Sequence, residues 1–201
     1  MTRPLALILC FALAACAPKP IVSRPAADWR SVATSADREK LREWRSSFTE
    51  ALRDARATNA NEVAAEGVLL DPDAALGGPI PNGDYRCRVI KLGAQTPGML
   101  NFIAYPAFAC RVEPRQGIQG FAKLTGSQRP VGLIFPNDQL RQVFLGTMVL
   151  GDETRAMQYG ADTDRDIAAF VERIGPARWR LVIPRPAFES KTDVIELVPA
   201  N

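Results

Sequence analysis

From Asp84 onward, apolar and polar residues alternate in a series of short segments that are separated by turn residues. Alternation with a period of two is typical of strands that bury one face. Seven strands are expected, at residues 85–92, 102–112, 120–125, 131–135, 143–150, 179–183 and 194–198. Short strands in chain order with tight turns favour an antiparallel meander, which forms either a curved sheet or a small closed barrel of lipocalin-like character.

The segment before the strands has the pattern of an amphipathic helix. Thr34 and Asp37 stand at the spacing of a capping box, and large apolar residues then recur at steps of three and four with charged residues between them. A helix at about residues 35–58 and a short one at 61–66 are therefore expected. A third helix is expected at 163–175, where apolar residues also have helical spacing before a Gly-Pro pair.

Together these segments predict an α+β fold, in which an N-terminal amphipathic helix packs on an antiparallel sheet or small lipocalin-like barrel of about seven strands. Residues 28–82 supply the helical segment and residues 83–201 supply the β-rich region. The two are expected to form one domain, because this length suffices for one hydrophobic core and is short for two.

The N-terminus has the pattern of an export signal. Arg3 precedes an apolar run that ends at Ala15 and is shorter than the roughly 20 residues a transmembrane helix needs. The run closes with Leu13-Ala14-Ala15-Cys16, which resembles the bacterial lipobox. Residues 1–15 are therefore expected to be a signal peptide and Cys16 the acylated first residue. The alternative is an ordinary cleavage site beside an incidental cysteine.

The stretch at residues 16–27 follows the expected cleavage site and contains three prolines among small residues. Such a composition is typical of an extended tether. The residue after the lipidated position is Ala17, and an aspartate there would resemble an inner-membrane retention signal. The protein is thus expected to be periplasmic, bound to the membrane through its lipid, and to lie at the outer membrane.

The expected periplasmic localisation determines which cysteines can form a disulfide. Of four cysteines, Cys10 leaves with the signal peptide and Cys16 carries the lipid, so Cys87 and Cys110 face an oxidising compartment. A Pro-Gly turn at 96–99 lies between their strands and brings them within about two residues of direct opposition. A disulfide is expected, worth roughly 3 kcal/mol for a loop of this size. Two free buried thiols are the alternative.

Several classes of chemistry are excluded by residues that are missing. The chain has no histidine, so it lacks Ser-His-Asp and Cys-His nucleophile systems and His-containing zinc sites. A run of acidic residues at 162–166 begins like a calcium loop, but Ile167 and Arg173 stand where glycine and glutamate are needed. No metal or cofactor is expected. The net charge of +3, without a basic run, does not favour nucleic acid.

A cationic surface is the most suggestive feature of the β-rich region. Arg86, Arg88 and Arg111 alternate with the cysteines and are expected on the opposite face of the sheet. In the register that joins the two cysteines, Arg86 lies across from Arg111, and like charges in that position destabilise a sheet. Either acidic neighbours such as Glu113 offset the charge, or the surface binds an anion through the forked arginine donors.

Five parts of the chain carry a resemblance to a known family. They are Asp28-Trp29-Arg30, Gly83-Asp84-Tyr85-Arg86-Cys87-Arg88-Val89-Ile90-Lys91-Leu92-Gly93, Lys123-Leu124-Thr125-Gly126-Ser127-Gln128-Arg129-Pro130, Phe144-Leu145-Gly146 with Gly151-Asp152-Glu153, and Arg178-Trp179-Arg180-Leu181-Val182. These segments resemble the bacterial domain of unknown function 4893 over the mature domain. The resemblance implies no particular activity, ligand or catalytic residue. A weaker similarity, Tyr85-x-Cys87 on a lipoprotein, points to membrane-bound lysozyme inhibitors.

The expected function is that of a non-enzymatic periplasmic lipoprotein. It would bind an envelope protein or an anionic envelope component through Arg86, Arg88 and Arg111. The alternative is an inhibitor of, or an enzyme acting on, cell-wall glycans, with Asp152 and Glu153 as candidate acids.

Overall fold

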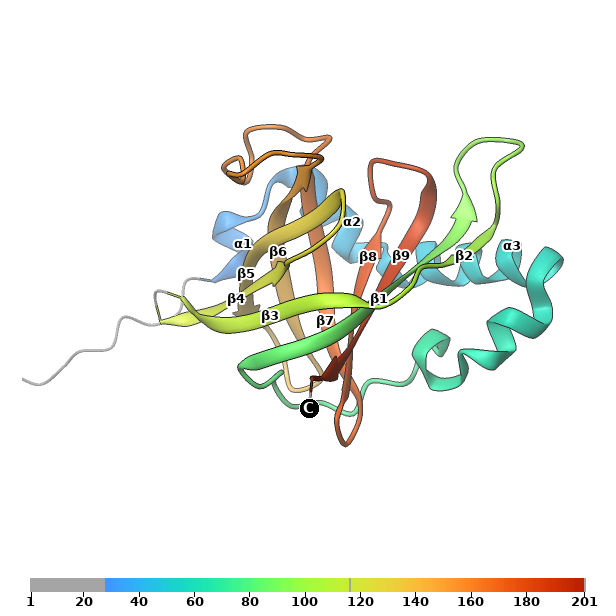
Figure 1. Cartoon of the computed structure of the whole chain (residues 1–201), viewed down its shortest axis with the longest axis horizontal. Coiled ribbons are helices and arrows are strands. Elements are labelled where there is room, and N and C mark those ends of the chain that lie inside the picture. Colours follow the sequence, from blue (N-terminus) through green and yellow to red (C-terminus); the bar gives the residue numbers. More distant parts are fainter. Residues whose placement is uncertain (1–27, 116, 201) are drawn as a thin grey trace, which may run out of the picture.

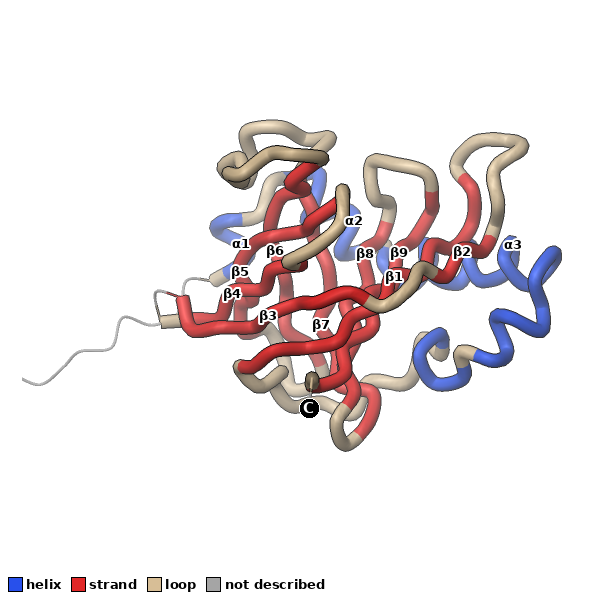
Figure 2. The backbone as a smooth tube through the Cα atoms, viewed as in Figure 1, coloured by secondary structure: helices blue, strands red, loops and turns tan. Residues whose placement is uncertain are grey.

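The computed structural model describes residues 28–115 and 117–200 (Figure 1). The expected signal peptide, the expected lipidation site Cys16 and the expected tether at 16–27 lie outside the described residues. Helices come first along the chain, and strands follow from Gly83 to Pro199 (Figure 2). No helix among the described residues has the length and apolar character to cross a membrane.

The helical segment consists of α1 (Trp29–Val32), α2 (Ser35–Arg42), α3 (Trp44–Ala65) and a short 3-10 turn, η1 (Gly67–Leu70). Thr34 caps α2 as expected, because its hydroxyl accepts from the Asp37 amide at 3.1 Å. The long helix expected at 35–58 is divided at Glu43. The short helix expected at 61–66 continues α3 beyond a kink at Asn59, whose φ and ψ are −136° and 46°.

Nine strands follow the helices, and eight of them close into an antiparallel barrel. They are β1 (Gly83–Ala94), β2 (Phe102–Ala104), β3 (Phe108–Arg115), β4 (Ile118–Lys123), β5 (Gln128–Pro136), β6 (Arg141–Leu150), β7 (Asp166–Gly175), β8 (Arg178–Pro184) and β9 (Ser190–Pro199). The order is β2-β1-β3-β4-β5-β6-β7-β8-β9, and β1 also pairs with β9. This confirms the lipocalin-like α+β expectation and selects the barrel over the open sheet.

Strand β1 makes closure possible because it has three partners. Its first half pairs with β3, its second half pairs with β2, and nearly its whole length pairs with β9. The strand expected at 102–112 is therefore two strands with different partners on β1. They are separated at residues 105–107, where Pro106 lacks the amide that a ladder needs.

The helix expected at 163–175 is wrong, since this segment is strand β7. It pairs with β6 on one side and β8 on the other. Ile167 and Val171 face the barrel interior, whereas Phe170 and Ile174 pack under the helices. A strand that is buried on both faces carries apolar residues at successive positions, as Ile167–Val171 does, so some of them also fall at helical spacing.

Two hydrophobic cores share the barrel wall. One fills part of the interior around Phe121 and Phe144, whose rings meet edge to face with centroids 5.6 Å apart. The other lies between the outer face and the helices, with Phe48 and Leu52 of α3 packed on β1, β8 and β9. The apolar stripe of the expected helix thus covers one side of the barrel, as the pattern predicted.

One end of the barrel is closed. The segment before β1 crosses it and inserts Ile80, which is 1% exposed, among the interior side chains. Gln142 accepts from the Ile80 amide at 2.9 Å, Gln119 donates to the Ile80 carbonyl at 2.7 Å, and the Tyr85 hydroxyl donates to the Pro81 carbonyl at 2.6 Å. We call this end the closed end.

The other end, which we call the open end, carries five connections at residues 95–101, 105–107, 124–127, 151–165 and 185–189. Because neighbouring strands are antiparallel, four of these connections leave the barrel at the same end. Residues 105–107 instead join β2 to β3, which pair with successive parts of β1, and they lie at the edge of the cavity described below. Figure 1 shows the larger of the open-end connections projecting together at the top of the view.

Candidate functional site

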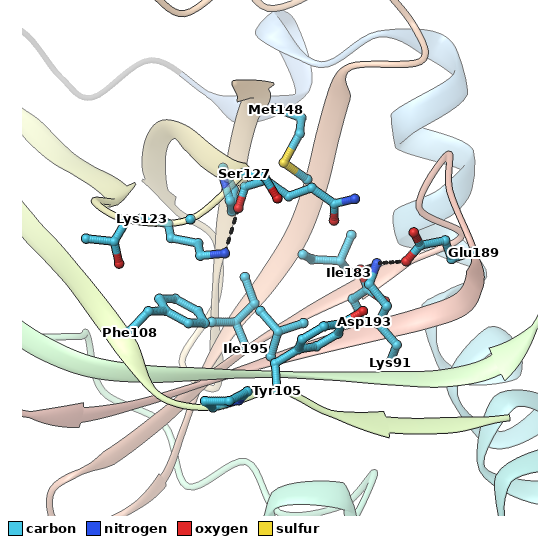
Figure 3. Close-up of a pocket in the computed structure, with 16 residues that line it drawn as sticks. Lys91, Tyr105, Phe108, Lys123, Ser127, Met148, Ile183, Glu189, Asp193 and Ile195 are labelled. Carbon is cyan, nitrogen blue, oxygen red and sulfur yellow. Dashed lines mark hydrogen bonds and ion pairs between the residues drawn. The ribbon is translucent and has the colours of Figure 1, made fainter. Parts of the chain in front are cut away.

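A cavity of about 450 Å³ occupies the interior of the barrel at its open end (Figure 3). This volume lies within the usual range for small-molecule sites. Inward-facing residues of seven strands line it, and the connections at 105–107 and 124–127 form part of its rim. Its lining is mixed. Polar and charged side chains share it with an apolar part, and the contributors to the apolar part are Val89, Phe108, Pro130, Met148, Ile183 and Ile195.

Lys123 is the most unusual side chain in this cavity. It is the last residue of β4, and its ammonium donates to the Gln128 carbonyl at 2.7 Å and lies 4.2 Å from the centroid of the Phe108 ring. No carboxylate of the described residues pairs with it. Burial, followed by the positive charges of Arg129 and Lys91, holds the pKa of Lys123 below its ordinary value.

Lys91 is the second cation of the cavity, and it is paired. Its side chain is 7% exposed and lies 3.3 Å from an Asp193 oxygen and 3.1 Å from a Glu189 oxygen. Burial alone would lower the pKa of Lys91, but the two carboxylates outweigh burial and raise it. Lys91 is therefore charged at neutral pH, and both of its partners are side chains of the protein itself.

Glu189 reaches Lys91 from the connection between β8 and β9. Both ends of this connection have left-handed backbone, with φ of 47° at Arg185 and 72° at Glu189. A non-glycine residue in this region costs roughly 1–2 kcal/mol, so other contacts must hold it there. Gln95 supplies two of them, because its amide nitrogen donates to the carbonyls of Pro186 and Ser190 at 2.7 and 2.6 Å.

The arrangement suits an organic anion with an apolar body. Lys123 offers an ammonium that is partly desolvated, and such a charge gains more from an anion than one in water does. Lys91 lines the same cavity on the side away from Lys123, and Glu189 already pairs with it there (Figure 3). The apolar part of the lining would receive the rest of the ligand.

The structure places Arg86, Arg88 and Arg111 on the outer face of the barrel, opposite the buried cysteines, as expected. The register differs from the expected one: Arg86 faces Ala109, and Arg111 faces Asp84. Arg111 donates to Asp84 at 2.6 Å, which offsets its charge. The expected opposition of two arginines is therefore wrong.

The positive charge of Arg88 is compensated by two carboxylates, whereas Arg111 has one. Arg88 donates to Glu66 at the end of α3 at 2.8 Å and to Glu196 of β9 at 3.0 Å. Arg86 lies beside it along a shallow depression of about 330 Å³ and forms no ion pair with any residue that the structure describes. Anion binding by this surface stays a prediction, and it now depends mainly on Arg86.

Cys87 and Cys110 lie at disulfide distance, with 6.0 Å between their Cα atoms and a sequence separation of 23. Cys110 is directly opposite Tyr85, and Cys87 is opposite Phe108, so the two cysteines are diagonal neighbours on the inner face. The sequence analysis placed them within about two residues of opposition. The diagonal arrangement needs no bulge to correct it.

The candidate acids Asp152 and Glu153 lie on the turn after β6. The Glu153 carboxylate accepts from the Leu150 amide at 2.9 Å and pairs with Arg165 at 2.8 Å. These two contacts, in that order of size, lower the pKa of Glu153. A general acid needs a raised pKa, so this environment does not suit Glu153 for that role.

Sequence reasoning missed the two cavity lysines, although the signal was present. Lys91 continues the inward series of Tyr85, Cys87 and Val89, and Lys123 stands two residues after the buried Phe121. A lysine at an inward position of an alternating strand is expected to lie inside a barrel. That argument required knowing that the sheet closes.

Comparison with known proteins identifies one family. No curated protein and no solved structure matches the chain. The family model described as "Domain of unknown function (DUF4893)" matches residues 29–197, which include almost all of the helices and the barrel. The resemblance read from the sequence is thereby confirmed, and the chain belongs to the family of this domain of unknown function.

Proposed function

We propose that this protein is a periplasmic lipoprotein that binds a small organic anion in the open end of its barrel and performs no reaction on it. The observation that supports this proposal is Lys123. It is a cavity lysine with a lowered pKa and, among the described residues, without a carboxylate partner. A desolvated cation in an apolar cavity is costly unless something compensates it, and an anionic ligand would do so.

The ligand proposed here has an anionic group and an apolar body. The anionic group would approach Lys123 and the face of Lys91 that Glu189 occupies. The apolar body would contact Phe108, Met148 and Ile195. Envelope components of this chemistry include acidic lipid fragments and other carboxylated or phosphorylated amphiphiles.

A binding role is favoured over the glycan-acting alternative. The chain has no histidine, and Glu153 is held in its charged form by a backbone amide and Arg165. The cavity itself contains Asp193 and Glu189, and both pair with Lys91. Both carboxylates are bound to one lysine, whereas glycoside hydrolysis uses two carboxylates that flank the scissile bond from separate positions.

The proposed localisation is supported by the sequence alone. Residues 1–15 would be removed, Cys16 would be acylated, and residues 16–27 would hold the domain near the membrane. An outer-membrane position fits the alanine after Cys16. The ligand would then come from the periplasm or from the membrane surface itself.

The test uses two fluorescent probes with the same aromatic body. Anilinonaphthalene sulfonate carries an anionic group, and phenylnaphthylamine lacks it. The folded protein is expected to bind the sulfonate more tightly than the neutral probe. Lys123→Gln is expected to remove this preference, because it deletes the unpaired ammonium and keeps the side chain polar.

The control is Lys191→Gln, which changes a lysine on the outer face that pairs with Glu50 and Asp54. It is expected to leave the preference for the sulfonate intact. Thermal unfolding of both variants checks that they are folded. Equal binding of the two probes by the wild-type protein, or an unchanged preference in Lys123→Gln, would contradict the proposal.

A further inference from the structure

Exposed apolar side chains gather at the open end of the barrel. The described residues include ten large hydrophobic side chains that are exposed, and six of these lie on open-end connections. The six are Met99, Leu100, Tyr105, Leu124, Met157 and Phe188. Leu100 is the most exposed of all ten, at 70%.

Three of the five open-end connections also contain no charged residue. They are residues 95–101, 105–107 and 124–127, in a chain whose residues are 23% charged overall. The charges of the other two connections are partly paired within the protein, Glu153 with Arg165 and Glu189 with Lys91. The rim therefore combines exposed apolar side chains with three connections that carry no charged residue.

These apolar side chains do not form one flat patch. They come from separate connections around the mouth of the cavity, and Tyr105 lines the cavity itself. A protein partner would need a matching set of separate pockets. A lipid surface accepts isolated apolar tips wherever they enter, and aromatic residues such as tyrosine suit the headgroup level.

We propose that the open end of the barrel docks on a lipid bilayer, with Leu100, Leu124 and Phe188 entering the interface and the cavity mouth facing the membrane. Loop tips that enter to the boundary of headgroups and acyl chains lie roughly 5–10 Å deep. A ligand of the proposed class would then exchange directly between the bilayer and the cavity. Docking itself depends on the rim and not on ligand binding.

The length of chain before α1 is compatible with this orientation. Trp29 at the start of α1 donates to Asn137, which lies on the turn between β5 and β6 at the closed end. Strands of ten residues that tilt as barrel strands do rise about 25 Å. The eleven residues from 17 to 27 reach up to roughly 40 Å when extended, so an anchor at Cys16 would allow the open end to face the same membrane.

The experiment places tryptophan at the rim and at a matched control position. Leu100→Trp and Leu124→Trp mark the open end, and Leu140→Trp marks the closed end with the same 44% exposure as Leu124. The native tryptophans, Trp29, Trp44 and Trp179, are at most 9% exposed and give a constant background. The full-length protein is bound to vesicles of phosphatidylcholine or of phosphatidylcholine with brominated acyl chains, which quench tryptophan on contact.

Brominated lipid is expected to reduce the emission of Leu100→Trp and Leu124→Trp relative to ordinary lipid, and to leave Leu140→Trp at the wild-type level. Equal quenching of all three variants, or no quenching of the rim variants, would overturn the proposal and leave the rim to a protein partner. The same measurement in the Lys123→Gln background separates the two proposals. Quenching that persists there supports docking even where anion binding is lost.

Discussion

At the scale of single residues, Lys123 links the site to pH. A carboxylate or sulfonate binds the protonated lysine, and the pKa of Lys123 lies below its ordinary value of 10.5 because of burial, Arg129 and Lys91. We expect binding of anilinonaphthalene sulfonate to weaken as pH rises toward 10.5, earlier than for an ordinary lysine. A titration of probe affinity against pH measures this, and Lys123→Gln should lack the transition.

The same shift has a defined sign for stability. Between the lowered pKa of the folded state and the ordinary value of the unfolded state, the unfolded chain binds more protons at this lysine. The contribution of Lys123 to stability therefore increases as pH rises through that window. Ligand binding and stability are thus expected to change in opposite directions with pH.

Glu189 is expected to compete with the ligand anion for Lys91. Glu189→Gln removes a pair with 3.1 Å between nitrogen and oxygen and keeps the shape of the side chain. A partly exposed pair of this kind is worth about 1 kcal/mol or less, so affinity for the anionic probe should rise up to about fivefold. Glu43→Gln is the control, since Glu43 pairs with Arg185 of the same connection outside the cavity. A fall in affinity for Glu189→Gln would show that Glu189 supports the site.

Several residue-level features were predictable from the sequence because they are local. The Thr34 cap and the proximity of Cys87 and Cys110 depend on a few neighbouring positions. The register between β1 and β3 was not predictable, since it depends on how the intervening residues divide between β2 and its flanking connections. The observed register between β1 and β3 differs from the expected one by two residues. Each side chain therefore lies on the expected face of the sheet but has a different cross-strand partner.

At the scale of elements, β7 shows where pattern reasoning fails. The segment alternates between two apolar environments, the barrel interior and the layer under the helices. Both faces are mainly apolar, so a period of two does not stand out in the sequence, and the pattern predicts a helix capped by Thr163. The other strands were located because their outward faces are at least partly polar.

A buried ion pair joins β7 and β8 beneath the helices. Arg180 and Glu172 are both 0% exposed, with 2.7 Å between nitrogen and oxygen, and Arg180 also donates to the Leu69 carbonyl at 2.6 Å. Arg180→Met should destabilise the protein by about 3 kcal/mol in urea unfolding, because it leaves a buried carboxylate with less compensation. Arg115→Met, at a side chain 61% exposed, should change stability by less than about 0.5 kcal/mol.

The double variant Arg180→Met with Glu172→Met tests the cause of that loss. It should be more stable than Arg180→Met alone, because the buried carboxylate is gone. If the double variant is the less stable of the two, the pairing of Glu172 with Arg141 outweighs the cost of the buried carboxylate, and the effect of Arg180 comes from its packing against Phe48 and η1.

At the scale of the whole molecule, local sequence patterns do not predict whether the barrel closes. The strands that complete it, β1 and β9, are separated by almost the entire β-rich region. Strand alternation predicts which residues share a face, but not whether the two edges of the sheet meet. The cavity exists only because they do, and for this reason the site was missed while the fold class was predicted.

The proposed lipidation of Cys16, which would anchor the whole molecule to a membrane, can be tested without a ligand. Mass spectrometry of the mature N-terminus is expected to find Cys16 as the first residue, carrying a diacylglyceryl group, and Cys16→Ser should prevent that modification. A mature chain that begins elsewhere, or an unmodified Cys16, would contradict the lipoprotein proposal. The anion-binding cavity would be unaffected by that result.

Ile80 determines by which route a ligand could enter and leave the cavity. This side chain and its hydrogen-bonded segment close one end of the barrel, and aromatic rings fill the interior next to them. The described residues therefore leave access to the cavity from the open end. A molecule that enters must leave by the same route. Under the proposed function, the protein would therefore take up and release its ligand at one end of the barrel and would not pass it through from one end to the other.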